Sequence, residues 1–255
     1  MRGFVDGIRK WFSLCYIMYL IIDIQYFPSV NLYKNVYKFS NIVFDQYESY
    51  QKMGFRNRCQ LAGAQGVVNL SVPLVRGRGQ KTLVRDVRVS HRQPWQAQHW
   101  KTIVSCYSRS PWFDHYRDGL EGLYRRQFDF LLDWDLACFD WSVRVLGLAI
   151  PVGLTERWER DYPASEAVDW RGRLRPKGGG ALGTDRAGAR EADRAEAREA
   201  DRAEARKVDQ GEMSWVDRPV RYRQVFEERT GFIPNLSILD LLFCEGKNAK
   251  ECLER

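Results

Sequence analysis

The sequence contains few of the residues from which metal and redox sites are usually built. Its three histidines, His91, His99 and His115, lie far apart, and none of its six cysteines pairs with another in a Cys-x-x-Cys spacing. Cysteines such as Cys106 and Cys138 lie inside apolar patterns, which is typical of buried free thiols in a reducing compartment. We therefore predict no metal ion, no cofactor and a cytoplasmic location.

The sequence also lacks an apolar run of the length that crosses a membrane. A run of about a dozen residues ending at Ile22 is shorter than the roughly 20 residues that a spanning helix needs. Arg2, Arg9 and Lys10 before it imitate the start of a signal peptide, but no small-residue cleavage site follows. We interpret residues 1–18 as a variable N-terminal extension. The alternative is an interfacial or signal-anchor segment that contacts a membrane.

Basic residues outnumber acidic ones. The chain carries 40 lysines and arginines against 33 aspartates and glutamates, a formal net charge of +7. This surplus is compatible with an anionic small molecule, a nucleic acid or an anionic membrane surface as partner. It does not choose among them, and the composition gives no indication of an oligomeric state. Hydrophobic residues make up 44% of the chain, enough for a sizeable core in one or two domains.

Residues 178–212 form a low-complexity segment rich in arginine, alanine and glutamate. The octapeptide READRAEA occurs twice in tandem, at residues 190–197 and 198–205, and arginine recurs every fourth residue around it. The segment has no apolar stripe with which a helix could pack. We interpret it as an insertion. The remaining residues, 19–177 and 213–255, then form a single domain.

The first part of that domain predicts a β-α-β unit. An apolar run from Tyr19 to Ile24 is typical of a buried strand, and Pro28 ends it. Ser29 is a good N-cap for a helix with apolar residues at helical spacing, and residues 42–44 form a second short strand. The connection between them is long enough to leave the two strands parallel.

Later segments complete an α/β fold. Further strands are predicted at three places, namely residues 59–72 (a hairpin), 83–89 and 148–154. Apolar residues at helical spacing predict several helices over residues 94–148, a short one over 222–228 and one that begins at Asn235. The predicted fold class is therefore α/β, with a mixed sheet opened by the β-α-β unit and a helical layer from residues 94 to 148.

Polar side chains follow both strands of the predicted β-α-β unit. Gln25 and Tyr26 come after the first strand and Asp45 after the second, so a parallel pair brings them to one edge of the sheet. This edge, beside the N-terminus of the intervening helix, is where α/β proteins bind ligands. We predict that Gln25 and Tyr26 bind a ligand and that Asp45 takes part in catalysis. A motif of known catalytic chemistry is absent from this stretch and from the rest of the sequence.

The segment after Asp45 combines aromatic and cationic side chains. Aromatic rings stack on other rings, and cations hold phosphate or carboxylate groups. The alternative is an exposed loop without a ligand. The predicted ligand-binding residues of this segment are Tyr47, Lys52, Arg56, Asn57 and Arg58.

His99 is the candidate for general acid/base catalysis, since imidazole titrates near neutral pH. Lys101 lies two residues away and is predicted to contact the ligand. The alternative is a histidine that packs in the core beside Trp100, in the middle of a predicted helix.

Several short motifs, taken together, resemble the WbqC-like protein family over about residues 20–175 and 220–250. They are Gln25-Tyr26-Phe27-Pro28, Asp45 to Lys52, Asn57-Arg58, Val72-Pro73, Asp86-Val87, Trp95 to Lys101 with its central His99-Trp100, and Gly231 to Phe243. The first 18 residues and the arginine-alanine repeat depart from the family pattern.

The resemblance implies a setting in the assembly of O-antigen and other surface polysaccharides, without a settled reaction. We therefore expect a transferase-type enzyme that binds an anionic nucleotide-linked or lipid-linked sugar. The alternative is a non-catalytic binding or scaffold protein of the same pathway. Nucleic-acid binding rests only on the basic charge and on arginines interleaved with aromatic residues, without a recognised module, so no nucleic-acid partner is predicted.

Overall fold

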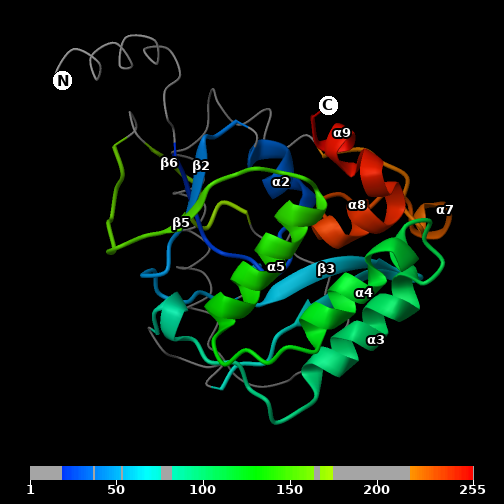
Figure 1. Cartoon of the computed structure of the whole chain (residues 1–255), viewed down its shortest axis with the longest axis horizontal. Coiled ribbons are helices and arrows are strands. Elements are labelled where there is room, and N and C mark those ends of the chain that lie inside the picture. Colours follow the sequence, from blue (N-terminus) through cyan, green and yellow to red (C-terminus); the bar gives the residue numbers. More distant parts are fainter. Residues whose placement is uncertain are drawn as a thin grey trace, which may run out of the picture. The chain divides into compact units, whose positions relative to one another are not determined.

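Four parallel strands form the main sheet (Figure 1). The structure is a computed structural model that describes residues 19–36, 38–52, 54–75, 82–163, 167–174 and 219–254. The strands are β1 (Tyr19–Ile22), β2 (Asn41–Phe44), β5 (Val152–Leu154) and β6 (Ala167–Asp169). They lie in the order β5-β2-β1-β6, with each neighbouring pair parallel.

The predicted β-α-β unit is confirmed. The helix α2 (Val30–Val36) connects β1 to β2, and the two strands pair in a register that sets Ile22 beside Phe44. Both of these side chains are fully buried, as expected for a strand that is covered on its faces. The α/β fold class is confirmed as well. The predicted mixed sheet is wrong in detail, because the parallel and the antiparallel strands form separate sheets.

The antiparallel sheet is the hairpin predicted around the Gly-rich turn. It consists of β3 (Arg58–Gly63) and β4 (Gly66–Ser71), and Gly66 adopts a φ of 118° that favours glycine at this turn. The strand predicted over residues 83–89 is wrong. A 3₁₀ turn, η1 (Val84–Asp86), lies there instead. Its flanks hydrogen-bond to separate segments, Val84 to Glu48 and Val89 to Asp129, so no continuous ladder forms.

The predicted helical layer is confirmed as α3 (Trp95–Tyr107), α4 (Phe113–Tyr124) and α5 (Leu131–Val145). Figure 1 shows α3 and α4 side by side, and α4 also contacts α5. Trp134 of α5 is completely buried, with its ring centroid 5.2 Å from those of Trp95 and Tyr124 and 5.6 Å from that of Tyr26. This aromatic cluster fastens the helical layer to the segment that follows β1.

The C-terminal part consists of α7 (Glu227–Thr230), α8 (Ile238–Glu245), η2 (Gly246–Asn248) and α9 (Ala249–Glu254). The helix predicted over residues 222–228 is wrong, because residues 219–224 are irregular and only α7 is helical. The helix predicted from Asn235 begins later, and its N-cap is Ser237, whose side chain accepts a hydrogen bond from the Leu239 amide.

Asp240 joins α8 to its neighbours. Its carboxylate is fully buried and accepts hydrogen bonds from the hydroxyls of Tyr107 (2.6 Å) and Tyr222 (2.7 Å). Burial raises the pKa of Asp240 to about 6, and the two tyrosines oppose this rise. Asp240 is therefore a hydrogen-bonded anchor of the core.

Two predicted segments, residues 1–18 and 178–212, lie outside the described residues. Within the described ranges, no helix combines the length and the apolar character that crossing a membrane requires.

Candidate functional site

The carboxyl ends of the four parallel strands lead into polar residues. Asp23 follows β1, Asp45 follows β2, Thr155 follows β5, and Arg171 follows β6 by two residues. The strand β1 lies between β2 and β6: from β1 the strand order runs through β2 to β5 on one side, and the chain then crosses back to β6 on the other side. Such a topological switch point is where open α/β sheets bind ligands. We call the residues gathered here the carboxyl edge: Asp23, Gln25, Asp45, Glu48, Arg56, Thr155 and Arg171.

Asp45 connects three of the four strand ends. One carboxylate oxygen accepts hydrogen bonds from the backbone amide of Tyr47 (2.9 Å) and the hydroxyl of Thr155 (3.1 Å). The other accepts from Nη1 of Arg171 at 2.8 Å. The side chain is completely buried. Asp45 therefore holds the loops after β2, β5 and β6 in a fixed arrangement.

Arg171 is held on every side by acceptors. It forms a bidentate pair with Asp169, donates to the Glu159 and Arg160 carbonyls, and stacks 5.1 Å above the Tyr162 ring. Burial alone would lower the pKa of Arg171, but the hydrogen bonds with Asp169 and Asp45 raise it. The guanidinium is permanently charged and its charge is balanced by these two carboxylates.

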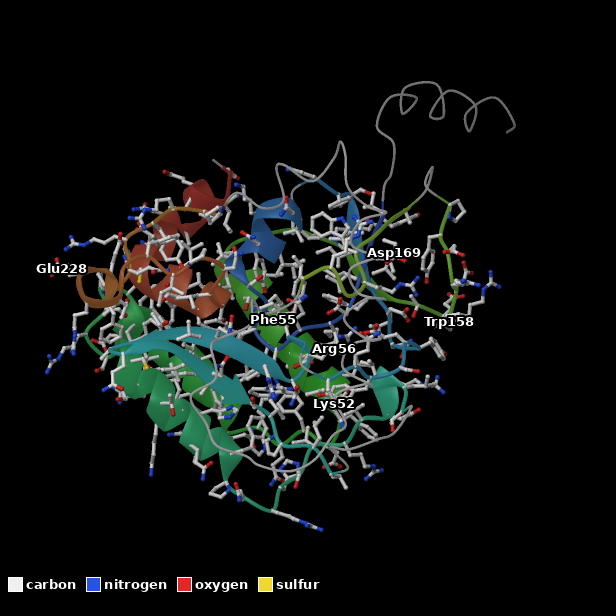
Figure 2. The ribbon with its side chains drawn as sticks, turned by 180° about the vertical axis from the view of Figure 1, so that it is seen from behind. Lys52, Phe55, Arg56, Trp158, Asp169 and Glu228 are labelled. Carbon is white, nitrogen blue, oxygen red and sulfur yellow. The ribbon has the colours of Figure 1, made fainter. Side chains whose placement is uncertain are left out.

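Arg56 supplies the second buried cation, on the segment between β2 and β3 where Figure 2 labels it with Lys52. It forms a bidentate hydrogen-bonded pair with Glu48, with both distances at 2.7 Å, and its Nη1 lies 3.8 Å from Asp23. Burial raises the pKa values of Glu48 and Asp23, while the guanidinium opposes the rise. The backbone amide of Gly172 also donates to Asp23, at 2.7 Å.

Two buried polar side chains beside this network are incompletely hydrogen-bonded. Gln25 is 0% exposed, and its amide approaches the Asp23 carboxyl and lowers the pKa of Asp23, without a hydrogen bond of good geometry among the described residues. Asp135, on α5, is also 0% exposed, and neither carboxyl oxygen finds a partner in the described ranges. Burial raises the pKa of Asp135 well above its ordinary value, and nearby Arg56 opposes this only in part. Burial therefore favours the protonated form of Asp135.

His99 and Tyr26 form a buried hydrogen-bonded chain. The Tyr26 hydroxyl lies 3.0 Å from Nδ1 of His99 and 2.5 Å from the Tyr124 hydroxyl. Burial lowers the pKa of His99 to about 4, and a hydrogen bond to the Ser71 backbone opposes this. His99 is thus neutral at physiological pH, and both of its ring nitrogens have partners. It packs on Tyr26 and Trp95, with ring centroids 5.9 and 5.1 Å away.

Two of the predicted ligand-binding residues stabilise the loop after β2. Asn57 donates to the Val72 carbonyl at 3.0 Å and accepts from the Tyr50 hydroxyl at 2.9 Å, which fastens the loop to the end of the hairpin. The ring of Tyr47 lies 4.5 Å below the guanidinium of Arg85.

The remaining predicted cations differ in exposure. Lys52 is exposed, and Arg58 is partly buried at the start of β3. Lys101 is exposed on α3, whereas His99 is buried. Two residues turn a helix by about 200°, so Lys101 faces away from the His99 side of α3.

Sequence reasoning missed five residues of this region. Asp23, Glu48, Thr155 and Arg171 sit in polar stretches that also contain exposed residues, so their burial has no local signal. Asp135 does have one: it shares a helical stripe with Leu131, Cys138 and Ser142, all buried. A carboxyl group on an apolar stripe marks an internal polar site.

The arrangement suits polar recognition and proton transfer. A protonated carboxyl such as that of Asp135 donates a hydrogen bond, and the amide of Gln25 both donates and accepts. In the described ranges, no group of three or more histidine, cysteine, aspartate or glutamate side chains is placed to hold a metal ion.

The fold and this edge define an α/β protein with a buried polar site at the carboxyl ends of a parallel sheet. A family model described as the WbqC-like protein family matches residues 24–252. The chain therefore belongs to the WbqC-like family. Among curated proteins and solved structures, none matches the chain.

Proposed function

We propose that this protein is a transferase-type enzyme of O-antigen or other surface-polysaccharide assembly, which binds a nucleotide-linked or lipid-linked sugar at the carboxyl edge. The observation that carries the proposal is the pair of buried side chains, Gln25 and Asp135, whose polar atoms are incompletely hydrogen-bonded among the described residues. Buried polar groups are nearly always hydrogen-bonded, so such a pair marks the place where a bound molecule would complete the bonding. Membership of the WbqC-like family supports the polysaccharide setting.

The charges at the edge limit where an anionic group binds. Arg56 and Arg171 are already paired with carboxylates. We therefore assign the phosphate or carboxylate of the ligand to the exposed Lys52, and Arg58 stays a ligand-binding residue that the sequence predicts. Lys101 is on the far face of α3 and serves this role less well.

The catalytic roles of Asp45 and His99 stay predictions. Each is fully hydrogen-bonded and buried, which favours positioning of the ligand by Asp45 and of Tyr26 by His99. Asp135 adds a third candidate, because its raised pKa suits a group that donates a proton. A cytoplasmic location is part of this proposal, since nucleotide sugars are cytoplasmic metabolites.

A thermal-shift panel of nucleotide sugars tests the proposal. Candidate ligands include UDP-N-acetylglucosamine, UDP-galactose and dTDP-rhamnose. A ligand at about 100 times its Kd stabilises a folded protein by about 2.7 kcal/mol, which raises Tm by several degrees. We expect Gln25→Met to lose the ligand-induced rise in Tm, because an apolar side chain of similar shape cannot hydrogen-bond to the ligand.

Controls separate binding from folding. Arg58→Ala is expected to weaken binding of the anionic group, and Gln98→Met, an exposed glutamine on α3, is expected to respond like the wild type. If no nucleotide sugar raises the Tm of the wild type, the nucleotide-linked substrate is wrong and the lipid-linked sugar is left as the substrate to test.

The alternative function is a non-catalytic binding or scaffold protein of the same pathway. The complete hydrogen bonding of Asp45 and the neutrality of His99 favour it. It predicts that cells carrying His99→Ala still make surface polysaccharide, whereas Asn57→Ala or Arg58→Ala abolishes it. Loss of polysaccharide with a folded His99→Ala protein argues for catalysis.

A further inference from the structure

A hollow of about 430 Å³ lies between the start of α3 and the end of α4. Three aromatic side chains, Trp95, Trp100 and Tyr124, contribute to its wall, and Ala97 is the small residue among them. Its size lies within the range of small-molecule sites, roughly 300–1,000 Å³, and such sites combine aromatic walls with a few polar groups. Neither the family nor the proposed function assigns a role to it.

One wall residue carries an unused donor. Trp95 is 3% exposed, and within the described part of the chain its indole Nε1 has no hydrogen-bond acceptor. A buried indole N–H usually finds an acceptor. This nitrogen has almost no exposed surface, so Trp95 contributes its ring and not a hydrogen-bond donor to the wall of the hollow.

The polar part of the wall is electrically balanced. Glu121 and Arg125 form an ion pair at 2.7 Å, which cancels their charges, and the other polar groups include the amides of Gln93 and Gln127. A balanced wall of aromatic rings and amides does not select an anion. It matches an uncharged molecule with one apolar face and several hydroxyl groups, which is the chemistry of a sugar ring.

The hollow is connected to the carboxyl edge. The Tyr124 hydroxyl hydrogen-bonds to that of Tyr26, and Tyr26 directly follows Gln25 in the chain. A sugar ring in the hollow is thus separated from the carboxyl edge by one layer of aromatic residues.

We propose that this hollow is a saccharide subsite that takes one uncharged sugar ring. The aromatic wall stacks against the C–H face of the ring, and the amides of Gln93 and Gln127 hydrogen-bond to its hydroxyls. The assignment of that ring to the acceptor glycan rests on the proposed function. The binding of an uncharged sugar rests on the hollow alone.

Saturation-transfer difference NMR on the full chain tests the subsite. The probes are methyl pyranosides of glucose, galactose, mannose, N-acetylglucosamine, rhamnose and fucose at millimolar concentration. We expect at least one glycoside to receive saturation from the wild type. Ala97→Trp, which fills the hollow without removing a packing residue, and Trp100→Ala, which removes one wall, are each expected to weaken binding at least about tenfold.

Two matched controls confine the effect to the hollow. Trp158 is an exposed tryptophan, 56% exposed and labelled in Figure 2, that lies outside the hollow, so Trp158→Ala is expected to bind like the wild type. Gln25→Met changes the carboxyl edge and is also expected to bind the glycoside normally. Loss of the signal in either control overturns the assignment to the hollow.

The outcomes distinguish this inference from the proposed function. No saturation transfer to any glycoside, or wild-type binding by both Ala97→Trp and Trp100→Ala, overturns the subsite. Binding of a methyl glycoside without stabilisation by any nucleotide sugar supports the subsite and contradicts a nucleotide-linked sugar as the substrate of the carboxyl edge.

Discussion

Buried charge at the carboxyl edge depends on pairing. Arg56 is surrounded by Glu48 and Asp23, and the Arg56 and Asp23 side chains are 3% and 1% exposed. Water cannot screen an ion at this depth, so each charge is tolerated only while its partner is present. These paired charges fix the shape of the carboxyl edge. Because they are already paired, a ligand is expected to bind to other groups of the site.

Removing the buried guanidinium is therefore expected to be costly. Arg56→Met leaves Glu48 and Asp23 as buried carboxylates without a cation, and we expect a loss of about 3–5 kcal/mol in the free energy of unfolding, measured by urea denaturation. The double variant Arg56→Met/Glu48→Gln should regain part of it. The exposed pair of Arg144 with Asp140 is the matched control, and Arg144→Met should cost less than about 1 kcal/mol. Equal costs at both sites contradict the pairing argument.

Asp135 makes stability depend on pH. Its pKa is raised in the folded state, so folding takes up a proton, and the stability it contributes is full at low pH and lost as pH rises through the folded pKa. Asp135→Asn removes this loss. We expect the difference in unfolding free energy between the variant and the wild type to shift in favour of the variant as the pH rises from 5 to 7, by up to about 1.4 kcal/mol per pH unit.

The neighbour Asp133 provides the control for this pH series. It lies on the same helix but is exposed, so Asp133→Asn should keep a constant difference from the wild type across the range. A constant difference for Asp135→Asn as well shows that Asp135 is ionised in the folded protein.

At the residue scale, the sequence predicts polar residues near the strand ends but does not predict the residues that pair with them. Gln25, Asp45 and Arg56 are found because each lies near the end of a recognisable strand or in an aromatic, cationic loop. Arg171 is not found, because only the pairing of β6 with β1 brings it to Asp45, 126 residues away. Contacts between distant segments leave no local pattern.

At the scale of elements, the sequence predicts the helices and strands that have a local pattern of their own. The unit β1-α2-β2, the hairpin and the helices α3 to α5 are predicted because each has its own periodicity. The three-residue strand β6 lies in a charged stretch and exists through its pairing with β1. Residues 83–89 alternate like a strand, but the backbone of Val84 hydrogen-bonds to Glu48, whereas Val87 and Val89 hydrogen-bond to Leu131 and Asp129.

The junction between α8 and α9 is fixed by a close approach of ring and backbone. Gly246 has a φ of 55°, and a Cβ placed there would lie 2.0 Å from Cδ2 of Trp112. We expect Gly246→Ala to cost about 2–4 kcal/mol of unfolding free energy, from the left-handed backbone and from overpacking. Chemical denaturation measures it.

Gly122 on α4 is the matched control for this substitution. A Cβ at Gly122 meets no atom within 4 Å, so Gly122→Ala is expected to stabilise the helix by about 0.5–1 kcal/mol. A loss of unfolding free energy for Gly246→Ala together with a gain for Gly122→Ala supports the close contact between Gly246 and Trp112. A Gly246→Ala variant of unchanged stability shows that Trp112 moves freely.

At the scale of the whole molecule, the C-terminal part is built into the same domain as the sheet. The Val30 amide donates to the Leu236 carbonyl, the Ser237 amide donates to the Gln60 carbonyl, and α8 contacts α2, α4 and β3. These contacts join residues on either side of the low-complexity segment without involving it. The domain is thus defined by packing between its two separated parts.

We therefore expect the low-complexity segment to be dispensable for folding. Replacing residues 178–212 by eight Gly/Ser residues shortens the connection, and loop-closure entropy changes by only about 0.6 kcal/mol per halving of length. Tm should stay within about 3 °C of the wild-type value in a thermal melt, and any nucleotide sugar that stabilises the wild type should stabilise the shortened chain equally. A chain with residues 178–212 in shuffled order controls for length and composition. A fall in Tm of more than 10 °C in the shortened chain alone shows that the length of the connection stabilises the domain. A similar fall in both the shortened and the shuffled chain shows that the sequence of residues 178–212 stabilises it.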